Sequence, residues 1–514
     1  MVTITCYGGV DEIGGNKVFL RDGDICLSFD FGTSFGRRYL FFEEYLKPRP
    51  GVGLLDLLKM ELLPPLEGIY RQDLVPNDDL WPSLRDSPLY RELSLDGVLL
   101  SHAHIDHSGY ISFLDTNIPI YATAMTAFIA KAMQDSGQAD FEKEVCYANP
   151  RELRDGVLRT GKCYRQRPFL FVDGFPASEE AKAFWSSSPA KTKPLEICAG
   201  TAPPDKIGGL RLRYFPVDHS IFGAAAFAVE TSEGWVGYTG DLRLHGARGH
   251  LTQRFIKEMR RLQPLALICE GTHVDSTKRV TEREVFANAL REVREAKGLV
   301  VADFGPRNVE RLITFYRIAQ ETGRKLVILS KDAYLLEAMR LISDDVPDIG
   351  SLSDIFIYRD PKARLAFWEE RLRQKYSSRT VSGADVRPNQ GDCILCFSFW
   401  DIKHLIDIEP EGGLYIYSSS EAYTEEQVID LKRLRNWLDH FGMRFAGDPE
   451  GGEEGLHASG HASGPDLLRI VRGIRPRVLI PIHTLDPGYF AAHLEGEGIQ
   501  VRIPELGEEI RLGP

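Results

Sequence analysis

Short apolar runs that each end near a polar or ionisable side chain recur along this chain. The runs are residues 25–29, 98–100, 210–216, 234–237 and 478–480. Residues 210–216 alternate apolar and basic side chains, which is the period of a strand with one buried face. The other runs have the length and apolar character of short buried strands. The pattern predicts strands whose ends carry polar side chains into loops, where such side chains can converge on one point.

From about residue 282 the pattern changes to alternating helices and strands. Thr281 and Glu284 have the spacing of a capping box, which predicts a helix that starts there. The next predicted elements are a strand at 298–303, a helix at 309–322, a strand at 325–329, a strand at 414–418 and a helix at 424–441. Strands separated by helices of this length imply a parallel sheet. We therefore expect residues 273–455 to form an α/β domain inserted into a first domain, which comprises residues 1–272 and 456–514.

The polar segment after residues 98–100 is rich in metal-binding side chains. Within six residues it contains His102, His104, Asp106 and His107. Neutral imidazoles and carboxylates are the ligands of catalytic zinc sites, and two pairs of them on one turn are enough for two adjacent metals. A polar surface loop that happens to contain histidines is the alternative. The metal site is favoured because ligand types also end the other predicted strands, at Asp30, His219, Asp241 and His483.

In their order along the chain, these motifs resemble the metallo-β-lactamase superfamily. Later motifs are similar to its β-CASP branch, which consists of nucleases. They are Glu270 at the end of an apolar run, the H-A-S-G-H-A run at residues 457–462, and Pro481-Ile482-His483. Their spacing is most similar to the ribonuclease J group, and in particular to its shorter prokaryotic relatives that lack a C-terminal domain.

The resemblance implies an α/β fold, in which a metallo-β-lactamase αββα sandwich carries an inserted β-CASP domain with a parallel sheet flanked by helices. It also implies an enzyme, a metal-dependent hydrolase that cuts RNA phosphodiester bonds. Single-stranded RNA would be the substrate, cut by exonuclease or endonuclease action in RNA processing or decay. Two metals sharing a hydroxide would activate the attack.

The resemblance further implies a role for each matched residue. The metal ligands would be His102, His104, Asp106, His107, His219, Asp241 and His483, with Asp241 bridging two divalent ions. Zinc is the default for this nitrogen-rich set and manganese the alternative. The catalytic residues would be Asp106, which orients the hydroxide, His461, which donates a proton to the leaving 3′ oxygen, and Glu270, which orients His461. His457 and Ser459 would bind substrate phosphate, and Asp30 would orient a ligand histidine.

The net charge of the chain argues against nucleic-acid binding, and its cysteines and apolar runs bear on its location. The formal net charge is −12 at pH 7, whereas proteins that bind nucleic acid usually carry a basic face. A local basic groove is compatible with this charge, and bound metals add positive charge where phosphate must lie. The eight cysteines lack the spacing of a secreted disulfide framework, and no apolar run approaches the roughly 20 residues of a membrane span. We therefore expect a cytoplasmic protein without membrane association.

Several alternatives stay open at the level of sequence. Besides a ribonuclease, the motifs fit a DNA nuclease of the same branch, or a small ester or thioester hydrolase or relic binding protein of the wider superfamily. His461 and Glu270 argue against a small substrate, which needs no extra proton donor. RNA and DNA are not separated, because that choice depends on contacts with the 2′-hydroxyl. The oligomeric state, monomer or homodimer, and the effect of two long irregular segments at 36–93 and 145–205 are also open.

Overall fold

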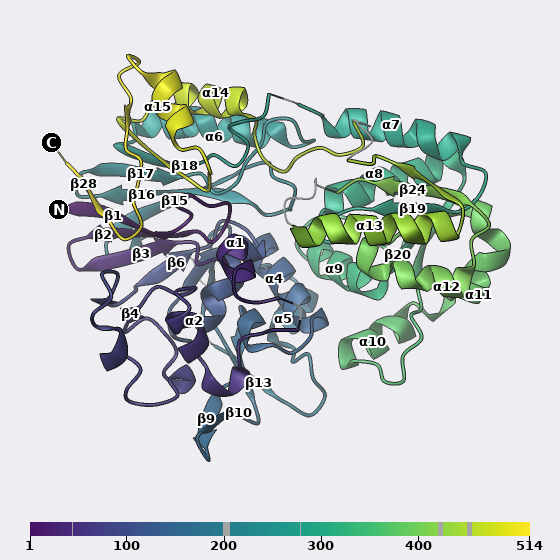
Figure 1. Ribbon diagram of the computed structural model, residues 1–514, viewed down its shortest axis with the longest axis horizontal. Helices are drawn as coiled ribbons and strands as arrows, with labels where there is room; N and C mark the ends of the chain where they lie inside the picture. Colours follow the sequence, from purple (N-terminus) through teal and green to yellow (C-terminus); the bar gives the residue numbers. More distant parts are fainter. Residues whose placement is uncertain (44, 199–205, 278, 420–424, 450–454, 514) are drawn as a thin grey trace.

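Two seven-stranded sheets make up one side of the molecule, on the left in Figure 1. The computed structural model describes residues 1–43, 45–198, 206–277, 279–419, 425–449 and 455–513. The first sheet contains, in order, β12 (Phe169–Phe171), β7 (Ile120–Ala122), β6 (Gly97–Leu99), β3 (Ile25–Phe29), β2 (Lys17–Asp22), β1 (Val2–Gly8) and β28 (Glu509–Leu512). The second contains β14 (Lys206–Ile207), β15 (Leu210–Pro216), β16 (Ala225–Thr231), β17 (Gly234–Tyr238), β18 (Ala266–Glu270), β26 (Val478–Ile482) and β27 (Gln500–Val501).

The two sheets pack face to face, with helices on their outer faces. One buried apolar cluster joins Ile4 and Phe29 of the first sheet to Phe227 and Ile480 of the second. A separate cluster packs the outer face of the second sheet against α6 (Gly249–Leu262), α14 (Gly464–Ile474) and α15 (Gly488–Leu494). The outer face of the first sheet packs against α2 (Leu55–Lys59) and α4 (Ala124–Ser136). These four layers are the predicted αββα sandwich.

A third seven-stranded sheet lies on the other side of the molecule, on the right in Figure 1, and we call it with its helices the parallel-sheet unit. Its strands, all parallel, are β22 (Thr380–Val381), β21 (Ile355–Tyr358), β20 (Lys325–Leu329), β23 (Cys393–Cys396), β19 (Val300–Asp303), β24 (Gly413–Tyr417) and β25 (Met443–Ala446). Helices α7 (Glu282–Glu295), α8 (Val309–Thr322) and α9 (Ser330–Arg340) cover one face. Helices α11 (Gly383–Val386), α12 (Leu405–Ile408) and α13 (Glu425–His440) cover the other.

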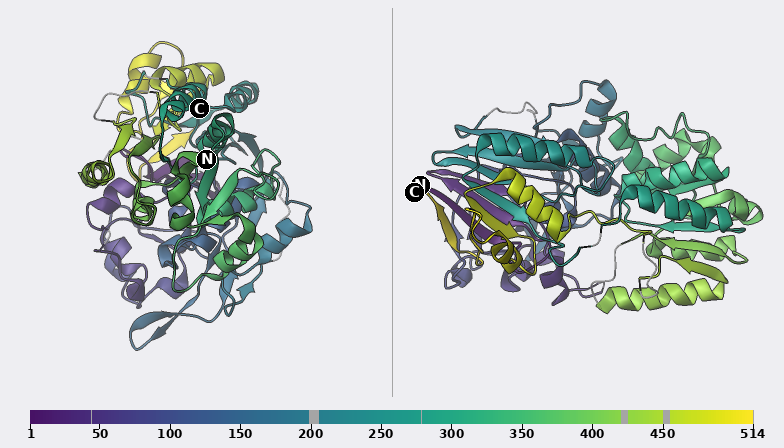
Figure 2. Two further views of the ribbon diagram at one scale, coloured as in Figure 1. Left: turned by 90° about the vertical axis from the view of Figure 1, so that its right-hand side faces the viewer. Right: turned by 90° about the horizontal axis from the view of Figure 1, so that it is seen from above.

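The parallel-sheet unit interrupts the sandwich between two neighbouring strands. Strands β18 and β26 pair in parallel in the second sheet, so that Glu270 lies opposite Ile482, yet all the strands of the third sheet come between them in sequence. The predicted α/β fold with an inserted parallel sheet is therefore confirmed. We propose domain boundaries at residues 272/273 and 455/456 on the basis of this arrangement, which Figure 2 shows from two further sides.

The segments 36–93 and 145–205, which looked irregular in sequence, are held by buried side chains. Leu57, Leu63 and Tyr70 are at most 1% exposed and belong to the same apolar cluster as the outer face of the first sheet. The second segment contributes Trp185 of α5 (Glu179–Ser186) to that cluster, and its residues 199–205 lie outside the described part of the chain. In the described residues, no helix has both the length and the apolar character needed to cross a bilayer.

Candidate metal centre

The predicted metal ligands all lie just beyond the ends of sheet strands. The loop after β6 carries His102 and His104, and the short helix α3 (Ile105–Ser108) that follows carries Asp106 and His107. In the second sheet, β15, β17 and β26 lead to His219, Asp241 and His483. The structure brings these side chains into two adjoining groups with ligand atoms within 4.8 Å of one another. This is the kind of convergence expected where strands of two packed sheets end at the same side.

The first group consists of three histidines whose ring nitrogens face one another. Nδ1 of His104 lies 3.0 Å from Nε2 of His102 and 3.1 Å from Nε2 of His219. Burial lowers the pKa of all three rings, that of His104 to about 4, so that they are neutral at physiological pH. The other nitrogen of His219, Nδ1, donates to the carbonyl of Gly460 at 2.6 Å, which leaves its Nε2 lone pair for a metal. Neutral imidazoles held in this way fit a metal ion.

The second group contains Asp106, His107, Asp241 and His483. An oxygen of Asp241 lies 3.0 Å from Nε2 of His107 and 3.6 Å from Nε2 of His102, which places this carboxylate between the two groups. Nε2 of His107, Nε2 of His483 and both oxygens of Asp241 are buried and have no hydrogen-bond partner among the described residues. Buried polar atoms are rarely left in this state. A bound cation would satisfy all four, so these residues fit a metal site.

The charges of the second group also favour a cation there. Burial alone would lower the pKa of His107, but the carboxylates of Asp241, Asp106 and Asp30 outweigh it and raise that pKa well above its ordinary value. The pKa of Asp241 lies well below its usual range, despite burial, because of His107, His483 and His461. A positive charge is therefore strongly stabilised at the point where the orphaned atoms meet.

Asp30 lies behind the ligands, where it holds His107. Its Oδ2 accepts from His107 Nδ1 at 2.7 Å, from the Ser101 hydroxyl at 2.7 Å and from the Tyr238 hydroxyl at 2.5 Å. A carboxylate on the far nitrogen orients an imidazole and fixes its tautomer. His483 is held similarly, because its Nδ1 contacts the hydroxyl of Thr272 at 2.8 Å. The sequence identified Asp30, whereas Ser101, Tyr238 and Thr272 carry no motif of their own and were missed.

Glu270 and His461 form a pair beside the second group. Oε2 of Glu270 accepts from Nδ1 of His461 at 3.0 Å, and the other oxygen, Oε1, accepts from the backbone of Leu242 at 2.7 Å. Burial lowers the pKa of His461, but Glu270 and Asp241 outweigh this effect and raise it to about 9. The Glu270 side chain is 1% exposed and that of His461 is 20% exposed. The pair thus presents a protonated imidazole at an accessible edge of the metal centre.

His457 and Ser459, predicted to bind phosphate, lie on the same loop as His461. The hydroxyl of Ser459 accepts from the backbone N–H of His461 at 3.0 Å. Nδ1 of His457 donates to the carbonyl of Ser418, which follows β24 in the parallel-sheet unit, at 3.0 Å. Burial, with the charge of Arg311, lowers the pKa of His457 to about 4. These contacts show Ser459 supporting the turn and His457 joining the two sides of the molecule.

A set of buried charges, which we call the junction cluster, lies behind this loop. Its members are Asp218, Arg243, Glu282, Glu310 and Arg311. Arg243 donates to Glu310 at 2.6 Å, to Glu282 at 3.3 Å and to the carbonyl of Ser459 at 2.8 Å. Arg311 donates to Glu282 at 3.0 Å, and both arginines are fully buried. The cluster fixes the loop that carries His461, and the sequence did not predict that its members meet.

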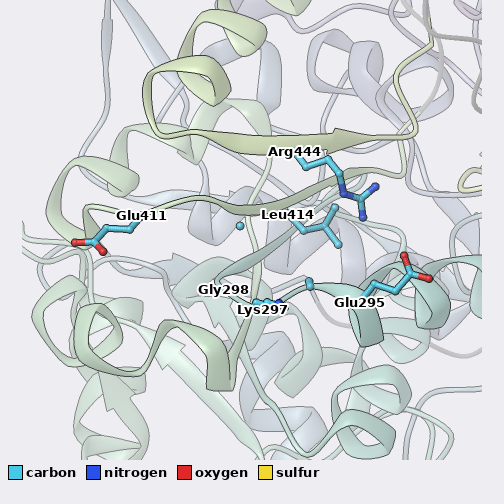
Figure 3. A pocket seen from close by; sticks show the side chains of 8 residues that line it. Glu295, Lys297, Gly298, Glu411, Leu414 and Arg444 are labelled. Carbon is cyan, nitrogen blue, oxygen red and sulfur yellow. The ribbon is translucent and has the colours of Figure 1, made fainter.

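A hollow of about 340 Å³ lies at the amino ends of β19 and β24 in the parallel-sheet unit. Figure 3 shows its lining, which includes Glu295, Lys297, Gly298, Glu411, Leu414 and Arg444. Charges of both signs line it without a group of metal ligands. Among the described residues, the groups of side chains that could hold a metal ion all lie at the metal centre.

The chain is similar to a family of metal-dependent hydrolases and to several ribonuclease J proteins. Residues 453–504 match a family described as the Zn-dependent metallo-hydrolase RNA specificity domain. The chain is similar to ribonuclease J of Sinorhizobium meliloti, with 24% identity over 82% of this chain and 64% of that protein. It is also similar to ribonuclease J of Pyrococcus abyssi, with 22% identity over 94% of this chain and 90% of that protein. The predicted resemblance to ribonuclease J proteins is thereby confirmed.

The chain thus spans less than two thirds of the length of the Sinorhizobium relative. A crystal structure of a protein of unknown function from Enterococcus faecalis covers 99% of both chains with a TM-score of 0.66 and 23% identity. That likeness supports the fold described above. The ligand groups and the metallo-hydrolase match together indicate a metal-binding hydrolase.

Proposed function

We propose that this chain is a ribonuclease that hydrolyses RNA phosphodiester bonds with two divalent metal ions, zinc by default and manganese as the alternative. The observation that carries the proposal is the position of Asp241 between two groups of ligands, next to the Glu270–His461 pair. The names of its relatives and the description of the family at residues 453–504 support RNA as the substrate.

In this proposal, His102, His104 and His219 would hold one metal, Asp106, His107 and His483 would hold the other, and Asp241 would contribute to both. The bound metals supply a nucleophile from water at neutral pH and positive charge for the phosphate oxygens. Asp106, at the edge of the centre with its side chain 21% exposed, orients the attacking water. Asp30 and Thr272 keep the ligand imidazoles in the required orientation.

The leaving 3′ oxygen of the sugar requires a proton, which His461 supplies. Glu270 accepts from Nδ1 of His461, so that the Nε2–H remains as the proton to be donated. The raised pKa keeps His461 protonated at neutral pH. Because part of its side chain is exposed, the ring regains a proton from solvent after each turnover. Ser459 fixes the backbone of this loop, and we retain phosphate binding by His457 and Ser459 as part of the proposal.

We also propose a cytoplasmic location, since no disulfide joins any of the eight cysteines, all of which lie in the described residues. Such thiols fit a reducing compartment. Monomer and homodimer stay equal predictions, which light scattering of the purified protein distinguishes.

The test uses single-stranded RNA labelled at the 5′ or the 3′ end, with matching DNA, incubated with zinc or manganese. We expect cleavage of RNA, with at least about a 100-fold loss in the His461→Ala variant and unchanged metal content. The control, His440→Ala, alters an exposed histidine at the end of α13 and should leave the rate unchanged. Cleavage of DNA alone, or of a thioester and no nucleic acid, would show that the proposal is wrong and that only the metal centre stands.

A further inference from the structure

Arg307 lies in the loop that joins β19 to α8 in the parallel-sheet unit. The carboxyl ends of parallel strands are where α/β sheets bind ligands, and the start of a helix favours anions. The two residues before it, Gly305 and Pro306, are exposed, and a side chain at Gly305 would meet no atom within 4 Å. The loop therefore borders open solvent just ahead of Arg307.

The start of α8 is fixed against the metal-bearing side of the molecule. One oxygen of Glu310 accepts from the backbone N–H of Ala247 at 2.7 Å, and the other accepts from Arg243 at 2.6 Å. Both donors belong to the segment that follows the metal ligand Asp241. Arg307 lies in the loop three positions before Glu310, so this loop starts close to the segment that follows Asp241.

The donors of Arg307 are not satisfied by the described residues. Its Nε is buried without a hydrogen-bond partner. Burial lowers the pKa of Arg307, and the nearby charge of Asp106 opposes this effect. By contrast Arg311, four residues later, donates to Glu282 and to the carbonyls of Ser418 and Leu456.

A metal ion at the second group would neutralise Asp106. Arg307 would then keep a positive charge that Asp106 no longer balances, in a loop held against the segment that follows Asp241. A guanidinium is suited to this situation, because its planar fork binds phosphate oxygens in pairs. A bound metal would therefore leave Arg307 with a positive charge that an anionic ligand could balance.

We infer that Arg307 binds a backbone phosphate of the RNA strand adjacent to the scissile bond and so selects a polynucleotide over a small phosphodiester. The inference rests on the proposed ribonuclease function and adds to it a binding residue from the parallel-sheet unit. It concerns the phosphate backbone and not the bases, so it predicts no preference for sequence.

The test compares Arg307→Gln and Arg307→Lys with Arg317→Gln, which removes the same charge from an exposed position on α8, the helix that follows Arg307. On single-stranded RNA, we expect kcat/KM to fall about 10- to 100-fold for Arg307→Gln and less for Arg307→Lys. The slope of log kcat/KM against log salt should become shallower by about 0.7 for Arg307→Gln. Hydrolysis of bis(4-nitrophenyl) phosphate, which has no neighbouring phosphate, and metal content should match the wild type.

Two results would overturn the inference while leaving the ribonuclease proposal intact. One is an Arg307→Gln protein with wild-type kcat/KM and salt slope on RNA. The other is a variant that loses RNA and small-diester hydrolysis equally, together with metal, because Arg307 would then only support the centre. Failure of the wild-type protein to cut RNA under the same conditions would instead reject both.

Discussion

Two dense groups of buried polar side chains lie on either side of the loop at residues 457–461, and they differ in how their polar atoms are satisfied. In the junction cluster, Glu282 and Glu310 accept from Arg243 and Arg311 at 2.6–3.3 Å. In the metal centre, Nε2 of His107, Nε2 of His483 and both oxygens of Asp241 have no hydrogen-bond partner among the described residues. The junction cluster is satisfied within the chain except at Oδ2 of Asp218, whereas four ligand atoms of the metal centre are left for a cation.

Two histidines of the loop at residues 457–461 have pKa values that are shifted in opposite directions. His461 faces Glu270 and Asp241, which raise its pKa to about 9 against the effect of burial. His457, four positions earlier, faces the junction cluster, where burial and Arg311 lower its pKa to about 4. The residue type is the same, so the neighbouring charges decide which ring is protonated at neutral pH and which is neutral.

The comparison separates chemistry from architecture. Unsatisfied buried atoms are expensive, so they are tolerated where a ligand completes them, whereas a satisfied charge network serves to join parts of a fold. Changes in the metal centre should therefore act mainly on activity, and changes in the junction cluster mainly on stability.

The largest expected effect comes from Asp241→Ala. The variant removes the carboxylate between the two ligand groups, so metal affinity should fall by at least about 100-fold and RNA cleavage should become undetectable. Metal analysis of the dialysed protein and the cleavage assay measure the two effects. Wild-type protein treated with a chelator should behave alike, but it should recover activity when metal is returned. A variant that retained its metal and its activity would show that Asp241 is not needed to hold the metal.

A smaller effect, on stability, is expected from Arg243→Ala. The variant leaves Asp218, Glu282 and Glu310 buried around an empty position, and removing one partner of a buried pair costs about 3–5 kcal/mol. The urea midpoint of unfolding should fall accordingly, while folded protein should keep its metal. Arg317→Ala, an exposed change on α8, should alter stability by less than about 0.5 kcal/mol. Equal midpoints for the two variants would contradict a structural role for the cluster.

The smallest expected effect is a shift in pH dependence in Glu270→Gln. Because the pKa of His461 is raised to about 9 from its ordinary 6.5, the donor form persists at neutral pH and is lost as pH rises through about 9. Without the Glu270 carboxylate that pKa falls, so the alkaline decline of kcat should move to lower pH by about one unit or more. Profiles of kcat between pH 6 and 10 measure the shift. An unmoved alkaline limb would mean that another group donates the proton.

The raised pKa of His461 also predicts that the folded protein loses stability as pH rises. The protonated His461 contributes stability that is fully present below pH 6.5 and is lost as pH rises from there to about 9. In Glu270→Gln the pKa of His461 is lower, so this loss of stability should be complete at a pH below 9.

Much of the fold was accessible from sequence because local patterns agreed with the final structure. The helix predicted at 309–322 and the strand predicted at 325–329 coincide with α8 and β20, and the capping box of Thr281 and Glu284 is present. The helix predicted at 424–441 is α13 (Glu425–His440), and residue 424 lies outside the described residues. These elements carry their periods and caps within a few residues, so no distant contact is needed to recognise them.

The site could be predicted only in its outline. The residues that converge in the two groups were recognisable as candidate ligands because each follows a strand in a dense or familiar motif. The partners that orient them were not, since Thr272 meets His483 and Tyr238 meets Asp30 across more than 200 residues of sequence. Threonine and tyrosine hydroxyls are common everywhere, and only the fold shows which of them faces a ligand. The junction cluster escaped for the same reason, because isolated charged residues look like solvated surface until their burial is known.

The interruption between β18 and β26 has a consequence for when activity appears as the chain is made. Glu270 is the last residue of one strand, and its partner His461 is 191 residues further along the chain. The ribosome therefore delivers His102, His104 and His219 before the parallel-sheet unit, and His461 and His483 only after it. Contacts this distant in sequence form late in folding. In the proposed ribonuclease, a nascent chain would therefore lack the Glu270–His461 pair, and remain inactive on RNA, until the intervening unit has been synthesised and folded.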